Sequence, residues 1–448
     1  MRCFLLLLIV IQLLRPWPAW AQGTMSLDPA ESIDRYVAPL VDLDVFSGVI
    51  LVARGDDIVV SRAYGLAERE FDIPVAVDHA FRIASISKSF TRVLAGRLSE
   101  RGILRLDDPL ARWLPEFPAA DRITIRHLLD HRAGVPSINS LPFDEEAFAP
   151  NSLAALVDSI ARMPLDFEPG TSESYSNGGY AVLALALEKA AGTPYPELLD
   201  AEVLRPLALE RTRHEREGEI VPRLARGYEP SPDGFGRMRH APFQQMMTKT
   251  GGGSLVSTAH DLHRWASALG RDPILSASTW AELFPEANIA LTGRNPGYNA
   301  ALLRDGEWIA VVLANNYAAG AAADVAEAAI RLASGEPAET LPVVAPIAPL
   351  AEELVPLAGT YALPDGILPL PPGTKVEIER SGDELVASLA GVPVDVLVPQ
   401  GNRTFLLRML WSTATFDEPV DGRSEGFEVR ALYRDAAFRV ERVAGERP

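Results

Sequence analysis

At 448 residues the chain is longer than one ordinary hydrophobic core requires, so about two to three domains are expected. Its composition, 48% hydrophobic and 23% charged, is that of a soluble globular protein. A formal net charge of −18 argues against nucleic acid and anionic membrane surfaces as partners, because like charges repel.

The first residues have the pattern of a cleaved secretory signal. Arg2 supplies a positive start, an apolar run follows from 3 to 14, and Ala19-Trp20-Ala21 has the spacing of a cleavage site. This run is too short to span a bilayer comfortably. We therefore expect residues 1–21 to be removed, leaving a secreted or periplasmic protein with no stable membrane span. An uncleaved anchor is the alternative. Cys3, the single cysteine, would be lost with the signal.

Two strands and a helix are predicted next. The strands at 48–53 and 58–64 flank a Gly-Asp turn, which indicates the first hairpin of an antiparallel sheet. The stretch 81–92 reads as the start of a helix that ends at Gly102. Ser85 and Lys88 are three residues apart in it, so the hydroxyl and the amine leave the same helix face.

That pair can form a nucleophile. A serine hydroxyl attacks only when a nearby base takes its proton, and Lys88 can be this base if its apolar neighbours bury it and lower its pKa. Ser-x-x-Lys alone is weak evidence, because roughly one chain in four of this composition contains it by chance. The interpretation therefore depends on the motifs that follow.

Two histidine pairs raise the question of a metal site. His127 and His131 are four residues apart on a predicted helix, but a metalloprotease helix needs Glu after the first histidine and this chain has Leu128. We expect His260 and His263 on the polar face of another helix. Because the chain also shows no cofactor motif, neither a metal nor a cofactor is predicted.

A turn-rich loop at 169–180 contains the next candidates and opens into an apolar helix at 181–191. Tyr175 and Asn177 are separated by one residue, so in extended backbone both side chains point the same way. A phenol beside a lysine can pass a proton to a leaving group, and the amide can hold a substrate carbonyl. Taken alone, Tyr-x-Asn in a loop is more often turn chemistry.

A second hairpin is predicted after the glycine-rich stretch 249–258. Strands at 298–304 and 308–315 flank Asp305-Gly306, and a third strand ends near Thr292-Gly293. An alanine-rich helix at 321–333 closes this region.

The C-terminal part reads differently. A proline-rich linker over 336–350 leads to a unit at 351–448, which we expect to be a small barrel or sandwich. Six short runs between turns predict its strands: 374–379, 384–389, 394–398, 404–409, 428–433 and 438–443.

Together these stretches resemble one family, the serine β-lactamases and penicillin-binding-protein-like hydrolases, in the branch with class C β-lactamases, D-aminopeptidases and related esterases. Ser85-Ile86-Ser87-Lys88 resembles its Ser-x-x-Lys motif, and Tyr175-Ser176-Asn177 resembles its Tyr-x-Asn motif. The resemblance implies an α+β fold, with a β-lactamase/transpeptidase-like antiparallel sheet flanked by helices in a serine hydrolase domain at 27–335. The C-terminal unit resembles the lipocalin-like domain appended to some members.

The resemblance also implies roles. Ser85 would attack a carbonyl and form an acyl-enzyme, with Lys88 and Tyr175 as the coupled base and acid. Asn177 would orient the substrate on its carbonyl side, and water would then release the acyl group.

The third family motif departs from the pattern. The family carries Lys or His, a variable residue and Gly on a strand that edges the site, whereas Leu291-Thr292-Gly293 lacks the cation. Lys249-Thr250-Gly251 spells the motif, but it precedes a helix cap and lacks the following strand pair, so we interpret it as a chance match. Arg294 is the expected replacement for the charge, and its backbone N–H with that of Ser85 forms the expected oxyanion hole. Thr292, Gly293 and Arg294 are therefore substrate-binding candidates.

Three functions remain open at this stage. A missing cation removes a charge-assisted contact of about 1.5 to 3 kcal/mol, which argues against penicillins and favours an exported serine hydrolase for carboxylic esters or small uncharged amides. The alternatives are a D-amino-acid-specific peptidase or penicillin-binding protein, and a non-catalytic binding protein on the same scaffold. The expected partner is a small ester, amide or peptide, and the sequence does not indicate an oligomeric state.

Overall fold

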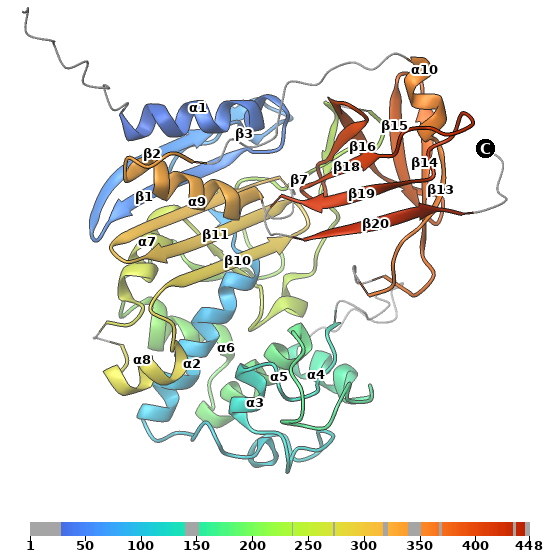
Figure 1. Ribbon diagram of the computed structural model, residues 1–448. Helices are drawn as coiled ribbons and strands as arrows, with labels where there is room; N and C mark the ends of the chain where they lie inside the picture. Colours follow the sequence, from blue (N-terminus) through green and yellow to red (C-terminus); the bar gives the residue numbers. More distant parts are fainter. Residues whose placement is uncertain are drawn as a thin grey trace, which may run out of the picture.

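We describe a computed structural model of the chain, which covers residues 28–138, 152–234, 236–271, 274–316, 321–338, 351–366, 370–432 and 436–443. The predicted signal segment 1–21 and positions 339–350 of the predicted linker lie outside the described residues. Figure 1 shows a sheet covered by helices, a mostly helical region below it and a strand-rich unit at one side. In the part of the chain described, no helix is both long and apolar enough to cross a membrane.

An antiparallel sheet of five strands, in the order β10-β11-β12-β1-β2, forms the centre of the N-terminal domain. Both predicted hairpins are present, and β1 pairs with β12 from Gly48 opposite Ala314 to Arg54 opposite Trp308. The strands are β1 (Gly48–Arg54), β2 (Asp57–Tyr64), β10 (Ile289–Asn295), β11 (Tyr298–Asp305) and β12 (Trp308–Ala314). Six of the seven β1 residues are buried, as expected of a central strand covered on both faces.

Helices cover both faces of this sheet. α1 (Pro29–Asp42) and α9 (Ala321–Ala333) lie on one face, where their buried apolar residues form one core with alternate side chains of the strands (Figure 1). α7 (Ala259–Ala268) packs against β1 and β12 on the other face. Both faces of the central strands are therefore covered by apolar side chains, whereas the edge strands β2 and β10 carry exposed residues.

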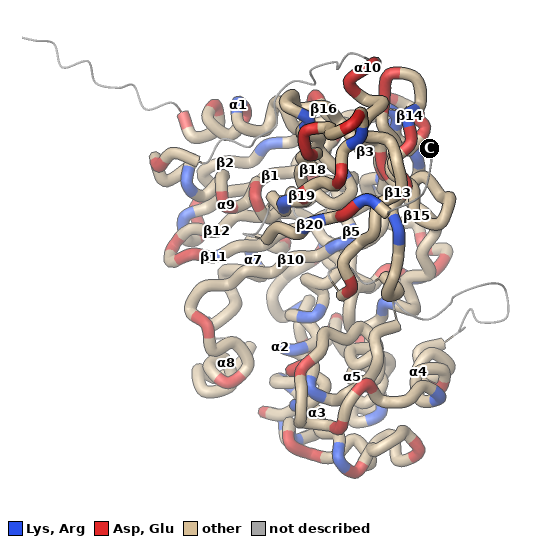
Figure 2. Tube along the Cα trace, turned by 45° about the vertical axis from the view of Figure 1, so that its right-hand side comes forward, with Lys and Arg blue, Asp and Glu red and all other residues tan. Residues whose placement is uncertain are grey.

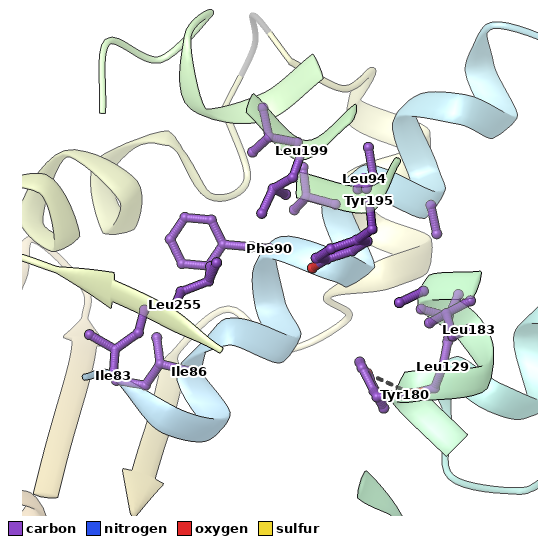
Figure 3. Packing of buried hydrophobic residues seen from close by; sticks show 14 of the residues in the cluster. Ile83, Ile86, Phe90, Leu94, Leu129, Tyr180, Leu183, Tyr195, Leu199 and Leu255 are labelled. Carbon is purple, nitrogen blue, oxygen red and sulfur yellow. Dashed lines mark hydrogen bonds between the residues drawn. The ribbon is translucent and has the colours of Figure 1, made fainter. Parts of the chain in front are cut away.

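The helical region shares a second apolar core with the face of the sheet that α7 covers. Figure 3 shows Phe90 and Leu94 of α2 facing Tyr195 and Leu199, with Leu129, Tyr180 and Leu183 close by. The Phe90 ring stacks on Trp265 with centroids 3.9 Å apart. The elements are α2 (Ser87–Glu100), α3 (Ile125–Leu129), α4 (Leu153–Ala161), α5 (Asn177–Ala191), α6 (Tyr195–Leu199), the π-helical turn η4 (Asp200–Leu204) and α8 (Ala277–Leu283).

Two predicted helix starts were misplaced. α5 begins at Asn177 rather than 181, because the Ser176 hydroxyl accepts the Gly179 N–H at 2.8 Å and caps the helix earlier. The stretch from Phe81 does not start as a helix. It begins as the short strand β5, and the helix proper starts at Ser87.

Short strands and turns connect these regions. β5 lies beside β9, which in turn pairs with β6, so that three short strands form a second sheet next to α2. The elements are β3 (Leu66–Glu68), β4 (Ile73–Pro74), β5 (Phe81–Arg82), β6 (Arg213–His214), β7 (Tyr228–Pro230), β8 (Met238–His240), β9 (Leu255–Ser257) and the turns η2 (Leu110–Arg112) and η5 (Met246–Lys249).

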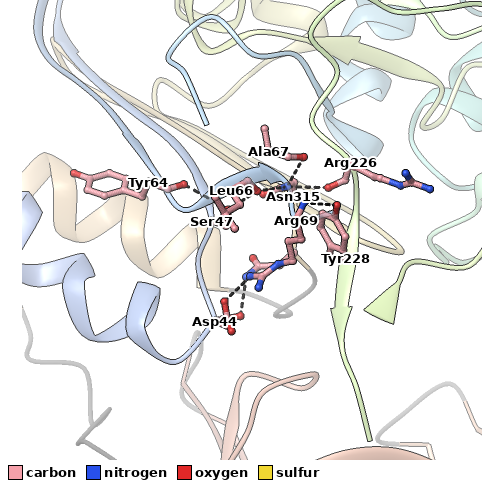
Figure 4. A network of polar contacts seen from close by, with 10 residues as sticks. Asp44, Ser47, Tyr64, Leu66, Ala67, Arg69, Arg226, Tyr228 and Asn315 are labelled. Atoms are coloured by element: carbon pink, nitrogen blue, oxygen red, sulfur yellow. Dashed lines mark hydrogen bonds and ion pairs between the residues drawn. The ribbon is translucent and has the colours of Figure 1, made fainter. Parts of the chain in front are cut away.

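A buried amide ties the β3 segment to the end of the central sheet. Asn315, fully buried after β12, donates from Nδ2 to the carbonyls of Leu66 at 2.9 Å and Arg226 at 2.8 Å. Ser47 donates to the same Leu66 carbonyl at 3.1 Å. Figure 4 shows this network, in which polar groups from segments far apart in sequence pair with one another.

The C-terminal unit is a closed eight-stranded antiparallel barrel in sequential order. The sequence indicated six of its strands and missed β13 and β18, which are short and lie beside turns. The elements are α10 (Ala351–Leu354), η6 (Val355–Leu357), β13 (Gly359–Ala362), β14 (Lys375–Ser381), β15 (Glu384–Leu389), β16 (Val392–Gly401), β17 (Thr404–Leu407), β18 (Ser412–Phe416), β19 (Gly426–Ala431) and β20 (Ala437–Arg442). The domain boundaries at 335 and 351 stay predictions.

The barrel packs against the N-terminal domain. Val398, Leu406 and Trp411 of the barrel join the apolar core under α1 and α9. The indole N–H of Trp411 donates a hydrogen bond to Asp324 of α9. Figure 2 shows acidic and basic residues interleaved over both units.

Candidate active site

A strained turn presents Ser85 at the junction of the two regions. Ser85 lies in the 3-10 turn η1 (Ala84–Ile86) between β5 and α2, and the Ile83 N–H donates to the Leu255 carbonyl of β9 at 3.0 Å. Ala84 has φ 46°, a conformation that residues other than glycine rarely adopt. The backbone therefore turns sharply just before the predicted nucleophile.

Three predicted catalytic groups converge at this turn. The Lys88 Nζ lies 3.2 Å from the Ser85 Oγ, and that Oγ lies 2.6 Å from the Tyr175 Oη. All three are within reach of direct proton transfer, although Tyr175 is 90 residues away along the chain. Tyr175 comes from the loop before α5 and is half exposed.

Lys88 is held by two further acceptors. Its amine donates to the Asn177 Oδ1 at 2.7 Å and to the Gly252 carbonyl at 2.8 Å. A neutral amine has two N–H groups and one lone pair. When both N–H groups are used in this way, the lone pair is left for the proton of the Ser85 hydroxyl.

The site favours a neutral lysine and a protonated tyrosine. Burial, and secondly the charge of Lys249, lowers the pKa of Lys88 to about 7. Burial raises the pKa of Tyr175, while the Ser85 hydrogen bond and the Arg294 charge act in the opposite direction. The direction for Lys88 is the one the sequence predicted. Its neighbours include the rings of Tyr175 and Tyr180, whose centroids lie 4.7 and 5.4 Å from the Nζ.

His131 supports the tyrosine loop and was missed as a site residue. Its Nδ1 accepts the Ser176 N–H at 3.2 Å, and its ring packs against Tyr175 and Tyr180 at centroid distances of 4.7 and 5.1 Å. Burial, followed by the charges of Lys88 and Arg92, lowers the pKa of His131 to about 4, so the ring is neutral at pH 7. Among the described residues no group of three metal-ligating side chains occurs, here or elsewhere.

Strand β10 runs against the Ser85 turn, where the third family motif was expected. A Cβ on Gly293 would lie 2.1 Å from the Ile83 carbonyl oxygen and 3.1 Å from the Ser85 nitrogen. Only glycine allows the strand to come this close. Thr292 is exposed on the same strand, and the side chain of Leu291 packs against the core that underlies the site.

Arg294 is the residue after Gly293 on β10, an edge strand of the sheet. Asn295 pairs with Tyr298 across the turn Pro296-Gly297, and hydrogen-bonded and open pairs alternate along an antiparallel ladder. Arg294 is one step from that closing pair, so its N–H turns towards the free edge of β10, which faces the Ser85 turn. The oxyanion hole formed by this N–H and that of Ser85 stays a prediction.

Lys249 lies closer to the site than its interpretation as a chance match suggested. It ends the turn η5 and is not on a strand, as expected. However, its carbonyl accepts the N–H groups of Gly252 and Gly253 at 3.0 and 2.7 Å, and its charge reaches Lys88. The local sequence does not indicate that Lys249 lies near Lys88, because the two residues are brought together by the packing of the glycine turn against α2 and α5.

Comparisons with known proteins found a matching family and several similar proteins. The family described as Beta-lactamase matches residues 33–306. Penicillin-binding protein 4* of Bacillus subtilis (strain 168) is 32% identical over 255 residues, which are 53% of this chain and 55% of that protein. The chain thus aligns with about half the length of this relative. Esterase EstB of Burkholderia gladioli is 31% identical over 321 residues, 61% of this chain and 79% of the esterase. The solved D-amino acid amidase from Ochrobactrum anthropi SV3 superposes with a TM-score of 0.59 at 25% identity, covering 69% of this chain and 98% of the amidase.

Proposed function

The chain belongs to the beta-lactamase family, and from this premise we propose that it is a serine hydrolase that cleaves carboxylic esters or small amides through an acyl-enzyme at Ser85. The observation that carries the proposal is the chain of contacts from Lys88 through Ser85 to Tyr175, at 3.2 and 2.6 Å. Burial of the Lys88 amine against the Ser85 hydroxyl is what a general base requires, whereas a non-catalytic binding protein does not require it.

Acylation begins with the neutral lysine. As the Ser85 Oγ attacks the substrate carbonyl, its proton passes to the lone pair of Lys88. The carbonyl oxygen becomes negative and receives the N–H groups of Ser85 and Arg294. The tetrahedral intermediate then expels the alcohol or amine, which takes up a proton from Tyr175. The tyrosinate then takes up the proton that Lys88 holds, directly or through a water molecule, so that both groups return to their starting states.

Deacylation repeats these steps with water. A water molecule at the position vacated by the leaving group attacks the acyl carbon, and its proton passes through Tyr175 to Lys88. The ester bond to Ser85 breaks, the acid is released, and the serine oxygen recovers a proton. The net reaction consumes one water and leaves the three groups as they began.

The strand beside the nucleophile bears on the substrate class. Leu291 stands where the family motif has a cation, so a substrate carboxylate would lack one charge-assisted contact worth about 1.5 to 3 kcal/mol. This favours esters and uncharged amides, in keeping with an esterase and an amidase among the similar proteins. The exposed guanidinium of Arg294, near Tyr175, keeps a D-amino-acid-specific peptidase as the second candidate.

Turnover of p-nitrophenyl acetate and butyrate tests the proposal. We expect Ser85→Ala to abolish turnover while the melting temperature stays close to that of the wild type. Ser159→Ala is a matched control, because this hydroxyl donates to the Ala155 carbonyl within α4, away from Ser85 in the sequence. Activity that survives Ser85→Ala would refute the proposal. Release of D-alanine from a peptide that ends in D-alanyl-D-alanine, in place of ester cleavage, would favour the second candidate.

We also propose that the protein is secreted or periplasmic, on the strength of the N-terminal pattern alone. Expression of the full chain in a bacterial host, followed by N-terminal sequencing of the periplasmic fraction, tests this. A mature start near Gln22 is expected. An intact Met1 end in the cytoplasmic or membrane fraction would contradict it.

A further inference from the structure

A second lysine stands directly behind the catalytic turn. The Cβ of Lys249 lies 3.6 Å from where a Cβ on Gly253 would be, and the same Gly253 position is 3.7 Å from the Ala84 carbonyl carbon. A Cβ on Gly252 would lie 3.3 Å from the Lys88 Nζ. Two residues without side chains therefore form the layer between Lys249 and the Ser85–Lys88 pair.

The backbone and the side chain of Lys249 have separate tasks. Its carbonyl holds the N–H groups of Gly252 and Gly253, and this turn aims the Gly252 carbonyl at Lys88. Any residue at this position keeps that carbonyl. The ammonium group is a different matter, because within the described ranges it has neither an ion pair nor a side-chain hydrogen bond.

The surroundings of Lys88 contain no compensating negative charge in the described part of the chain. The phenols of Tyr175 and Tyr180 face it, both protonated because burial raises their pKa values. The charge of Lys88 in turn helps to lower the pKa of the His131 ring, which is neutral at pH 7 and adds no negative charge. Arg92, one turn along α2, pairs with Asp130 at 2.9 Å, so this carboxylate already has a positive partner.

Of the two lysines, Lys88 is the one to give up its proton. It is 8% exposed, and burial lowers its pKa to about 7, whereas Lys249 is only partly buried. Burial lowers the pKa of Lys249 as well. Because the charge of Lys249 acts on Lys88, the more buried of the two amines becomes neutral first.

We propose that Lys249 is a positioning residue for the general base: its positive charge, on the η5 side of the glycine turn, holds Lys88 neutral. The inference rests on the proposed function, since it assumes that neutral Lys88 takes the serine proton. It assigns no contact between Lys249 and the substrate.

The test is the pH profile of kcat/KM for the uncharged substrate p-nitrophenyl acetate between pH 5 and 9, corrected for spontaneous hydrolysis. In Lys249→Met we expect the acidic limb to move up by about one pH unit, because Lys88 then binds its proton more tightly. Activity at pH 6 falls roughly tenfold, and activity at pH 9 returns to the wild-type level. Lys249→Arg keeps the charge and is expected to keep the wild-type profile.

Lys189→Met is the matched control, because Lys189 is an exposed lysine in the last turn of α5, and its profile should match the wild type. An unshifted limb in a folded Lys249→Met, or an equal loss at every pH, would overturn the inference. If Lys249→Met folds poorly, Lys249→Gln provides the same comparison. Loss of activity in Ser85→Ala together with an unshifted Lys249→Met limb would refute only the role of Lys249, whereas activity in Ser85→Ala would refute the proposed function itself.

Discussion

The contact between β10 and the Ser85 turn can be broken by adding one carbon atom. In Gly293→Ala the new Cβ would lie 2.1 Å from the Ile83 carbonyl oxygen, well inside the ordinary contact distance. The three atoms nearest to the added carbon all belong to the backbone, so no side chain can rotate away. The strand must therefore retreat by about 1 Å or more before the contact becomes tolerable.

That retreat acts directly on the proposed oxyanion hole. Arg294 is the next residue, so its N–H moves with the strand, while the Ser85 N–H stays with η1. A donor has to lie about 2.7 to 3.1 Å from the developing oxyanion, and losing one donor costs about a hundredfold to a thousandfold in kcat. We expect a loss of this size in kcat on p-nitrophenyl acetate, with a smaller change in KM.

Gly306→Ala is the control. Gly306 lies in the β11–β12 turn at φ 57°, where a Cβ meets no atom within 4 Å. It strains the backbone by about 1 kcal/mol but leaves the site alone. Its kcat should stay near that of the wild type, even if its melting temperature falls. A folded Gly293→Ala enzyme with unchanged kcat would refute the reasoning, because β10 would then not press against the nucleophile turn.

The remaining predictions concern the proton path and the docked barrel. Lys88→Met and Tyr175→Phe should each lower kcat about a hundredfold to ten-thousandfold, which steady-state kinetics on p-nitrophenyl esters will show; a folded variant at the wild-type rate would remove that residue from the path. In the wild type, kcat/KM should rise with pH through about 7, since neutral Lys88 is the active form, and a flat profile from pH 5 to 9 would contradict this. Asn177→Ala removes an acceptor 2.7 Å from Lys88 and should lower kcat/KM about tenfold, whereas an equal rate would mean that another group holds the amine. Burial raises the pKa of Asp324 from 3.8 to about 7, so the folded protein keeps a proton on this carboxyl that the unfolded chain loses above about pH 4. The melting temperature should therefore fall as the pH rises from about 4 to 7, and Asp324→Asn should flatten that slope. An unchanged slope in the variant would mean that the carboxyl is exposed to water.

Local spacing was enough to find the groups that lie close in sequence. Ser85 and Lys88 are one helical turn apart, and Tyr175 and Asn177 flank a single residue before a helix, so their chemistry is visible in the chain itself. The alternation and Asp-Gly signals likewise predicted the paired strands of the central sheet. These features depend on neighbours within a few residues.

Groups that depend on tertiary packing could not be found in this way. His131 reaches Tyr175 because α3 packs on α5, and its local pattern suggested only a false metal pair. Lys249 is near Lys88 because the glycine turn at 251–253 folds back between α2 and α5. In the family the motif that Lys249-Thr250-Gly251 matches lies on a strand, whereas here Lys249 ends a turn, and its charge nevertheless acts on Lys88.

Covalent labelling of the folded protein tests the central claim most directly. After treatment with a fluorophosphonate probe at pH 8, intact-mass and peptide analysis should show one adduct, on Ser85, that forms much more slowly in Lys88→Met and Tyr175→Phe. The absence of an adduct on the folded wild type, or an adduct on a different serine, would contradict the account.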